Sequence, residues 1–279
     1  MDVYRLFKLM SDRSSHNKRI AKNTLFLYLR MGLVLVVSLF STRVVLQALD
    51  IEDYGINNVV SGFVTMFAFL NTSMSNGVQR FYNFSLGRKN GYSIKDVYNT
   101  ALQIQAILAV TLLVPLETFG MWYIHTQMVI PIDRFAAAQW VFQFSVLSLV
   151  LLVLQIPYSA AIMAYEKMDY YAYLSIFDVL AKLGIAYIIK YTTFDKLILY
   201  GALNMLVSLI CFFLYYGYAK SHFQDLKSDF IIRKQLFKPM LYFSGWNGFG
   251  SFAYMIKSQG LNMLLNVFFG PIVNAARGV

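Results

Sequence analysis

The feature that most constrains this chain is a series of long apolar stretches, which follow one another with only short connections between them. A helix needs about 20 mostly apolar residues to cross a membrane, because the hydrocarbon core is ~30 Å thick. The eight predicted spans are Leu25–Leu49, Ile56–Phe81, Val97–Ile124, Ala136–Ala161, Tyr170–Ile189, Leu197–Tyr218, Phe237–Met255 and the shorter Leu261–Asn274. The sequence therefore predicts a protein that crosses a membrane several times.

The overall composition supports this prediction. Of the 279 residues, 58% are hydrophobic and 14% are charged, whereas soluble domains carry about 25% charged residues. This balance excludes an ordinary soluble protein, a disordered chain and a coiled coil. No segment alternates between apolar and polar residues as the strands of a membrane barrel do. Because backbone polar groups inside a bilayer must bond internally, we expect an all-α fold.

The basic residues are distributed unevenly around the predicted spans. The net charge is +10, and residues 1–22 form a basic segment without the apolar core of a signal peptide. With this segment in the cytoplasm, sixteen basic residues fall on inside segments and four on outside segments. Such a bias is typical of topology determinants. We therefore expect a cytoplasmic N-terminus and no nucleic-acid partner.

The sequence shows no metal, cofactor or catalytic pattern. Its one cysteine is Cys211, and its histidines, His16, His125 and His222, are far apart. The largest predicted outside loop, about His125–Phe135, contains no paired carboxylates and no nucleophile with a base beside it. We expect a protein that is not an enzyme and that binds no metal or cofactor.

Several predicted spans carry polar side chains, which are costly in hydrocarbon and so need a reason to be there. Arg30 and Arg43 lie in the first span. The second span turns polar in its inner half, where two adjacent stripes with i, i+4, i+8 spacing form one broad face. These stripes are Asn71, Ser75 and Gln79, and Thr72, Asn76 and Arg80. Polar pairs at i, i+4 recur in most other spans, so we expect a bundle around a hydrophilic interior.

Acidic residues inside the spans are few. Asp178 and Lys182 in the fifth span are four residues apart and can meet on one helix face. Glu117 lies in the third span. Two interpretations of the Asp178–Lys182 pair stay open: a neutralised structural pair, or a site that couples to protons or sodium. Glu117 is a separate candidate for such coupling.

Short motifs along the chain resemble those of one transporter family. They include Asn23-Thr-Leu-Phe-Leu-Tyr, Thr42-Arg43-Val44-Val45-Leu46, Asp53-Tyr54-Gly55-Ile56, Gln79-Arg80-Phe81, Ile156-Pro157-Tyr158, Phe243-Ser244-Gly245-Trp246 and Gln259-Gly260. In order and spacing they resemble the Wzx-type polysaccharide flippases, which belong to the multidrug/oligosaccharidyl-lipid/polysaccharide exporter superfamily.

This resemblance implies two six-helix bundles around a cavity that opens alternately to each side of the bacterial inner membrane. It implies translocation of an undecaprenyl-pyrophosphate-linked oligosaccharide, with cavity arginines holding the pyrophosphate. Arg43 and Arg80 match the family motifs, and Arg30 is a third candidate because of its position in the first span. Expected partners are this lipid-linked oligosaccharide, membrane lipids, polysaccharide-assembly proteins or a second copy of the chain.

The resemblance also divides the chain. Residues 1–22 would be the basic N-terminus, 23–218 the first bundle, 219–236 a cytoplasmic loop and 237–279 the start of a second bundle. Family members carry more spans than the eight predicted here, so we expect a member truncated at its C-terminus.

Two alternatives remain from the sequence. A drug/cation antiporter of the same superfamily would carry acids in its cavity. Here the span interiors hold three basic residues (Arg30, Arg43, Lys182) and two acids (Glu117, Asp178), which favours an anionic substrate. A membrane-embedded polysaccharide polymerase or ligase would need a large catalytic loop, which is not predicted.

Overall fold

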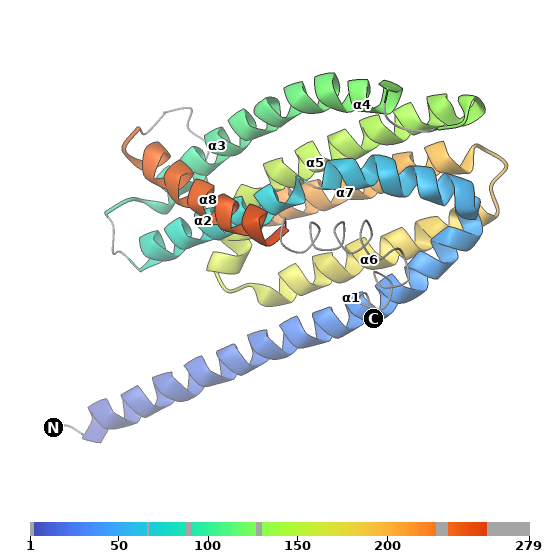
Figure 1. Cartoon of the computed structure of the whole chain (residues 1–279). Helices are drawn as coiled ribbons and strands as arrows, with labels where there is room; N and C mark the ends of the chain where they lie inside the picture. Colours follow the sequence, from blue (N-terminus) through green and yellow to red (C-terminus); the bar gives the residue numbers. More distant parts are fainter. Residues whose placement is uncertain (1–2, 66, 88–90, 127–129, 227–233, 256–279) are drawn as a thin grey trace.

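The computed structural model describes residues 3–65, 67–87, 91–126, 130–226 and 234–255. Every regular element in these ranges is a helix (Figure 1). Five stretches among them are long and apolar enough to cross a membrane: Ala21–Gly62, Ile94–Thr126, Ile132–Ala164, Met168–Lys190 and Lys196–His222. The predicted class, an all-α multi-spanning membrane protein, is confirmed.

The first helix, α1 (Val3–Thr65), consists of two legs joined by a sharp bend. The backbone of Asp50 has φ 65° and ψ 167°, which is not helical. Residues before Asp50 form the first leg, and residues after it run back beside the bundle (Figure 1). A positive φ with this ψ is almost restricted to glycine, so the bend stores backbone strain.

The expected second span, Ile56–Phe81, is not one continuous helix, and this expectation was wrong. Its first part belongs to the second leg of α1, and its second part is α2 (Ala68–Leu86). Between them the Phe67 amide donates to the Val64 carbonyl at 3.1 Å, and the Leu70 amide donates to the Phe67 carbonyl at 3.1 Å. These i→i−3 bonds replace the i→i−4 bonds of a continuous helix.

The expected third span is a rod made of three elements. It begins with α3 (Ile94–Pro115), whose N-terminus carries a capping box between Ser93 and Asp96. A π-helical segment, Leu116–Gly120, and the short α4 (Met121–Thr126) follow. The widening begins directly after Pro115, which has no amide hydrogen to continue the helical bonding.

The remaining helices agree closely with the predicted spans. A 3₁₀ turn, Ile132–Arg134, leads into α5 (Phe135–Ala164), which continues through Pro157. Then come α6 (Met168–Lys190), α7 (Lys196–His222) and α8 (Lys234–Met255). The expected eighth span, Leu261–Asn274, lies outside the described residues, as does the Gln259-Gly260 motif.

The helix α5 is the centre of the bundle, since it packs against α1, α2, α3, α6 and α7. Its contact with α7 is close because Gly201 has no side chain. A Cβ atom at Gly201 would lie 3.1 Å from the Phe144 ring and 3.3 Å from a Val141 methyl. Around α5 the buried side chains form apolar clusters, one of which includes Val141, Phe142 and Val153.

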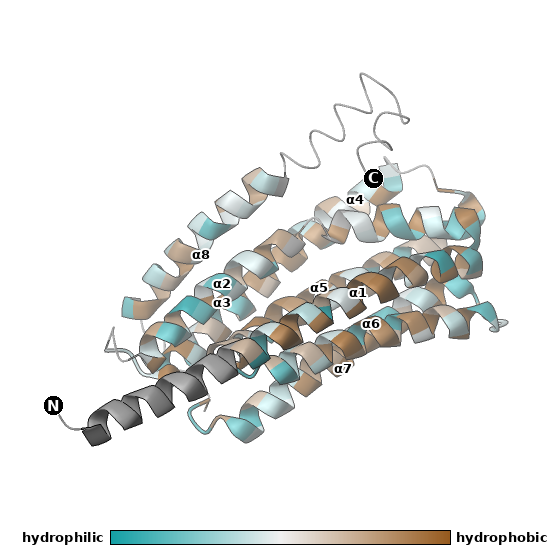
Figure 2. Cartoon of the chain, turned by 90° about the horizontal axis from the view of Figure 1, so that it is seen from below, coloured by the Kyte–Doolittle hydropathy of each residue, from teal (hydrophilic) through white to brown (hydrophobic). Residues whose placement is uncertain are grey.

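The helix α8 packs on α2 and α3, beside the rest of the bundle (Figure 2). The Ser73 hydroxyl of α2 donates to the Ser244 carbonyl of α8 at 2.5 Å. Gly77 faces the same point, where a Cβ atom would lie 2.0 Å from Ser244 Oγ. Small residues on both helices therefore allow the two backbones to approach closely.

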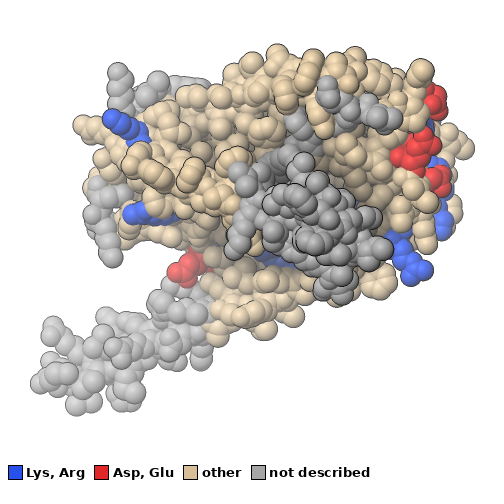
Figure 3. Space-filling model, in the orientation of Figure 1, with Lys and Arg blue, Asp and Glu red and all other residues tan. Residues whose placement is uncertain are grey.

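The outer surface is apolar along the helices and charged toward their ends. Leu29, Leu35, Leu39 and Phe40 of α1 are all more than half exposed. Most charged side chains on the face shown in Figure 3 lie toward the two ends of the molecule. This distribution suits helices surrounded by lipid, with water at both ends.

Aromatic side chains pack together at one end of the bundle, where α5 connects to α6 and where α7 ends. Tyr165, just after α5, stacks on Phe223, with ring centroids 4.1 Å apart. Its hydroxyl donates to the Asp225 carboxylate at 3.4 Å. Burial, and then the Asp225 carboxylate, raise the pKa of the Tyr165 phenol to about 12. The hydroxyl therefore remains a donor at neutral pH.

Candidate functional site

A cavity of about 680 Å³ lies among α1, α5, α6 and α7. Both legs of α1 line it: the first leg contributes Arg30 and Val34, and the second contributes Asn57 and Ser61. The bend at Asp50 is therefore what brings two parts of one helix to the same cavity. A cavity of this size with convergent polar groups is the default binding site in a helical bundle.

The wall of this cavity is rich in small polar side chains. They are Asn57, Ser61, Ser145, Ser148, Gln155, Ser175, Asn204 and Ser208. Several donate to the carbonyl four residues earlier in their own helix: Ser145 to Val141 at 2.8 Å, Ser148 to Phe144 at 2.8 Å and Ser175 to Tyr171 at 2.9 Å. Because their hydrogens are used in this way, the serine oxygens face the cavity chiefly as acceptors.

Arg30 is the cation on the cavity wall that has no acidic partner among the described residues. Its guanidinium carbon lies 4.6 Å from the centroid of the Tyr171 ring, a cation–π distance. Its Nε atom is buried and makes no hydrogen bond. A buried N–H of a charged group without an acceptor is costly, so Arg30 is suited to bind an anion from the cavity.

Asp178 and Lys182 of α6 also line the cavity. Lys182 Nζ lies 2.8 Å from Asp178 Oδ2, so the predicted i, i+4 contact is confirmed. Both side chains remain partly exposed, at 32% for Asp178 and 44% for Lys182. With Arg30 and Lys182 positive and Asp178 negative, the charged groups of the cavity wall sum to +1.

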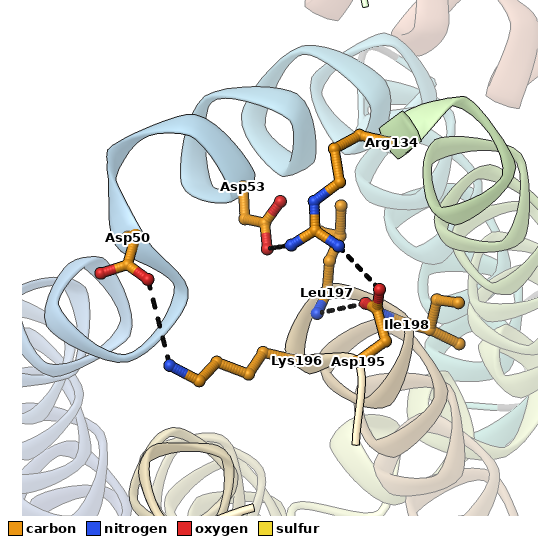
Figure 4. A network of polar contacts seen from close by, with 7 residues as sticks. All are labelled: Asp50, Asp53, Arg134, Asp195, Lys196, Leu197 and Ile198. Carbon is orange, nitrogen blue, oxygen red and sulfur yellow. Dashed lines mark hydrogen bonds and ion pairs between the residues drawn. The ribbon is translucent and has the colours of Figure 1, made fainter. Parts of the chain in front are cut away.

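A network of ion pairs lies at the end of the bundle that carries the α1 bend (Figure 4). Arg134, at the start of α5, is its centre. One of its nitrogens bonds the buried Asp53 carboxylate of α1, and Nη1 donates to Asp195 Oδ2 at 2.7 Å. The network thus joins the second leg of α1 to the starts of α5 and α7.

The same network caps α7. Asp195 Oδ1 accepts from the amides of Leu197 at 3.0 Å and Ile198 at 3.1 Å, as an N-cap aspartate does. Lys196 Nζ lies 4.0 Å from the exposed Asp50 carboxylate. Since Asn57 and Tyr200 of the cavity follow Asp53 and Lys196 by four residues each, the network holds the helices together at one end of the cavity.

The three predicted arginines lie in different places. Arg30 lines the cavity, whereas Arg43 is exposed on the first leg of α1 and has no partner among the described residues. Arg80 lies at the interface of α2 and α8, where its guanidinium carbon is 4.0 Å from the Phe243 ring centroid. Asp50 and Asp53, two of the acids that follow Arg43 closely in the sequence, are paired with Lys196 and Arg134 instead.

The polar face of the predicted second span does not line this cavity. Its members Asn71, Ser75, Asn76 and Gln79 lie on α2, which packs between α5 and α8. The cavity is instead bounded by the second leg of α1, on the other side of the break at Phe67.

Glu117 is separate from the Asp178–Lys182 pair. It lies in the π-helical segment and accepts a hydrogen bond from Gln143 Nε2 of α5 at 2.9 Å. It is not on the cavity wall. Glu117 and the Asp178–Lys182 pair are therefore two separate candidates for ion coupling, as the sequence presented them.

Most of the serines and asparagines of the cavity were not identified from the sequence. Asn57 and Ser61, and likewise Asn204 and Ser208, have the i, i+4 spacing that would have indicated a shared face. Single serines in apolar helices are common, because they bond to their own backbone. Among the described residues, no group of three or more His, Cys, Asp and Glu side chains is placed to hold a metal ion.

Comparison with protein-family models, curated proteins and solved structures finds no match to this chain.

Proposed function

We propose that this chain is a transporter of the bacterial inner membrane, which moves an undecaprenyl-pyrophosphate-linked oligosaccharide from the cytoplasmic to the outer leaflet. The observation that carries the proposal is Arg30, which lines a cavity with polar side chains on its wall, between apolar helices, and has no acidic partner among the described residues. The buried Nε–H of this charged group has no acceptor, which is costly, so Arg30 needs a function or a compensating ligand.

The chemistry of the cavity suits a phosphate group attached to sugars. A guanidinium can donate two parallel hydrogen bonds to phosphate oxygens. The serine and asparagine oxygens of the wall can accept hydrogen bonds from hydroxyl groups or from water that enters with the ligand. The cavity thus offers a donor for the anion and acceptors for its polar attachments, while the lipid tail stays in the surrounding bilayer.

A drug/cation antiporter is less well supported by the same residues. Asp178 is the acid on the cavity wall, and it is already paired with Lys182 at 2.8 Å. A cationic substrate would have to displace this lysine and also approach Arg30. An anionic substrate meets neither obstacle, because the wall has a net charge of +1.

The basic residues predict how the cavity lies relative to the two leaflets. Arg30 lies twenty residues before the bend at Asp50, which corresponds to about 30 Å along the helix. With the N-terminus in the cytoplasm, Arg30 lies toward the cytoplasmic leaflet and the ion-pair network toward the outer one. Alternating access would then require the network end and the Arg30 end to open in turn.

Complementation tests this function. The full chain is expressed in a strain that lacks its own Wzx-type flippase, and surface polysaccharide is measured. We expect the wild type and Arg43→Gln to restore the polysaccharide and Arg30→Gln to restore little of it, with equal amounts of protein in the membrane. Equal restoration by Arg30→Gln would contradict the proposed role of the cavity.

A further inference from the structure

A second hollow lies between α2 and α8, apart from the cavity described above. Its volume is about 570 Å³. It is lined by Phe69 and Thr72 of α2 and by Trp246, Asn247, Gly250, Ser251 and Tyr254 of α8. The two helices lie side by side in both cartoon views (Figures 1 and 2). We call this hollow the α2–α8 groove.

The polar side chains of the groove are not satisfied by the protein. Thr72, Asn247 and Ser251 make no hydrogen bond to any residue in the described part of the chain. In hydrocarbon each unsatisfied group would cost several kcal/mol. Lipid tails are therefore a poor occupant of this groove, and water or a polar ligand is a good one.

The two aromatic side chains on α8 lie on either side of the open space over Gly250. Trp246, Gly250 and Tyr254 are spaced i, i+4, i+8 on one stripe of α8, so the two aromatic positions are about 12 Å apart along the helix. A Cβ atom at Gly250 would meet nothing within 4 Å. Trp246 is 60% exposed and Tyr254 is 73% exposed, so both rings are accessible beside this space.

Two aromatic neighbours on α8 contact the Trp246 ring and restrict its orientation. Trp246 makes edge contacts with Tyr242 and Phe249, with ring centroids 6.1 and 6.2 Å apart. The two helices that carry the groove are joined by the Ser73–Ser244 hydrogen bond. The aromatic groups are therefore held in place before a ligand arrives, which reduces the entropy lost on binding.

The groove contrasts with the first cavity in charge, because none of its lining residues is charged. Exposed aromatic faces stack on the apolar face of a sugar ring, while an amide and two hydroxyls can exchange hydrogen bonds with its hydroxyl groups. We propose that the α2–α8 groove binds a neutral saccharide chain, with one sugar ring over Gly250 between Trp246 and Tyr254. This proposal rests on the proposed function, since it places the sugar part of the same substrate.

A larger side chain at Gly250 fills the space between the two aromatic rings and so tests the proposal without disturbing the fold. The full chain is purified into lipid nanodiscs. The probe is the free oligosaccharide released by mild acid from the lipid-linked pool of the cells that carry this chain. Binding is measured for wild type, Gly250→Leu, Trp246→Ala and Gly245→Leu. Gly245 is the matched control, because it also lies on α8 with nothing within 4 Å of a Cβ atom, but it does not line the groove.

We expect Gly250→Leu and Trp246→Ala to weaken binding of the free saccharide at least about tenfold, as loss of an anchoring aromatic does. Gly245→Leu and Arg30→Gln should leave it unchanged. Wild-type binding that Gly250→Leu does not weaken would overturn the proposal.

The intact lipid-linked oligosaccharide separates this proposal from the proposed function. If it binds in a manner that depends on Arg30 while the free saccharide does not bind, the groove proposal fails and the function stands. If the intact compound does not bind to the wild type at all, the proposed function itself fails.

Discussion

Arg134 Nη1 lies 2.7 Å from Asp195 Oδ2 and thereby ties the start of α5 to the start of α7. The same guanidinium bonds Asp53, whose side chain is only 5% exposed. A buried carboxylate that loses its cation is far more costly than an exposed one. The ion pairs at this end of the bundle should therefore differ widely in what they contribute to stability.

Removing Arg134 should destabilise the protein strongly. Arg134→Gln leaves Asp53 buried without its cation, and we expect a loss of about 3 kcal/mol in the free energy of unfolding. Lys196→Gln is the control, because its partner Asp50 is 81% exposed, and it should cost about 0.5 kcal/mol or less. Thermal unfolding of the purified variants checks both values, and similar losses for the two would contradict the assignment.

Replacing Asp50 by glycine at the bend in α1 should increase the stability of the protein. Asp50 holds a positive φ at a position where its side chain makes only a weak ion pair. Asp50→Gly removes backbone strain, and we expect a gain of about 1 kcal/mol in stability. Asp50→Ala, which loses the same ion pair but keeps the strain, should not give this gain. Thermal unfolding distinguishes the two variants.

The contact between α2 and α8 should be sensitive to added volume at one glycine. Gly77→Val places side-chain atoms where Ser244 already lies, and overpacking of this kind costs about 1–3 kcal/mol. Gly245→Val on α8 meets open space and should change stability little. The melting temperatures of the two variants, measured side by side, test this contact. Equal temperatures would show that the helices are not in close contact at Gly77.

The Asp178–Lys182 pair can be tested by a double-mutant cycle. Lys182→Met leaves Asp178 without its cation on the cavity wall, whereas adding Asp178→Asn removes the charge as well. Because both groups are partly exposed, we expect a coupling energy of about 1 kcal/mol or less. Transport should be impaired by the single change and recovered in part by the double change. A double variant as impaired as the single one would indicate that the charges act in transport itself.

Features that depend on neighbouring residues were predictable from the sequence. Hydropathy predicted Tyr170–Ile189 as a span, and α6 runs from Met168 to Lys190. The i, i+4 rule predicted the Asp178–Lys182 contact. Both depend only on the local helix, whose geometry is fixed by its backbone hydrogen bonds.

Features that join distant parts of the chain were not predictable in this way. Arg134 pairs with Asp53 across 81 residues and with Asp195 across 61, and periodicity within one helix says nothing about either contact. The polar face of the second span was expected to line a cavity, but the break at Phe67 separates α2 from the leg of α1 that lines the larger one, and Thr72 alone of its stripe residues lines the α2–α8 groove. Ser148 and Ser208 were missed because a serine is tolerated in any apolar helix.

In the proposed function, Arg30 binds the anionic head of the substrate in the cavity among α1, α5, α6 and α7. The most direct test is the affinity of the purified full chain for undecaprenyl pyrophosphate, compared among wild type, Arg30→Gln and Arg43→Gln. The two arginines lie on the same leg of α1, but only Arg30 lines the cavity. A charge-assisted hydrogen bond contributes about 1.5–3 kcal/mol, so Arg30→Gln should weaken binding at least about tenfold and Arg43→Gln less than about twofold. Equal affinity of wild type and Arg30→Gln, or equal losses in both variants, would contradict the account.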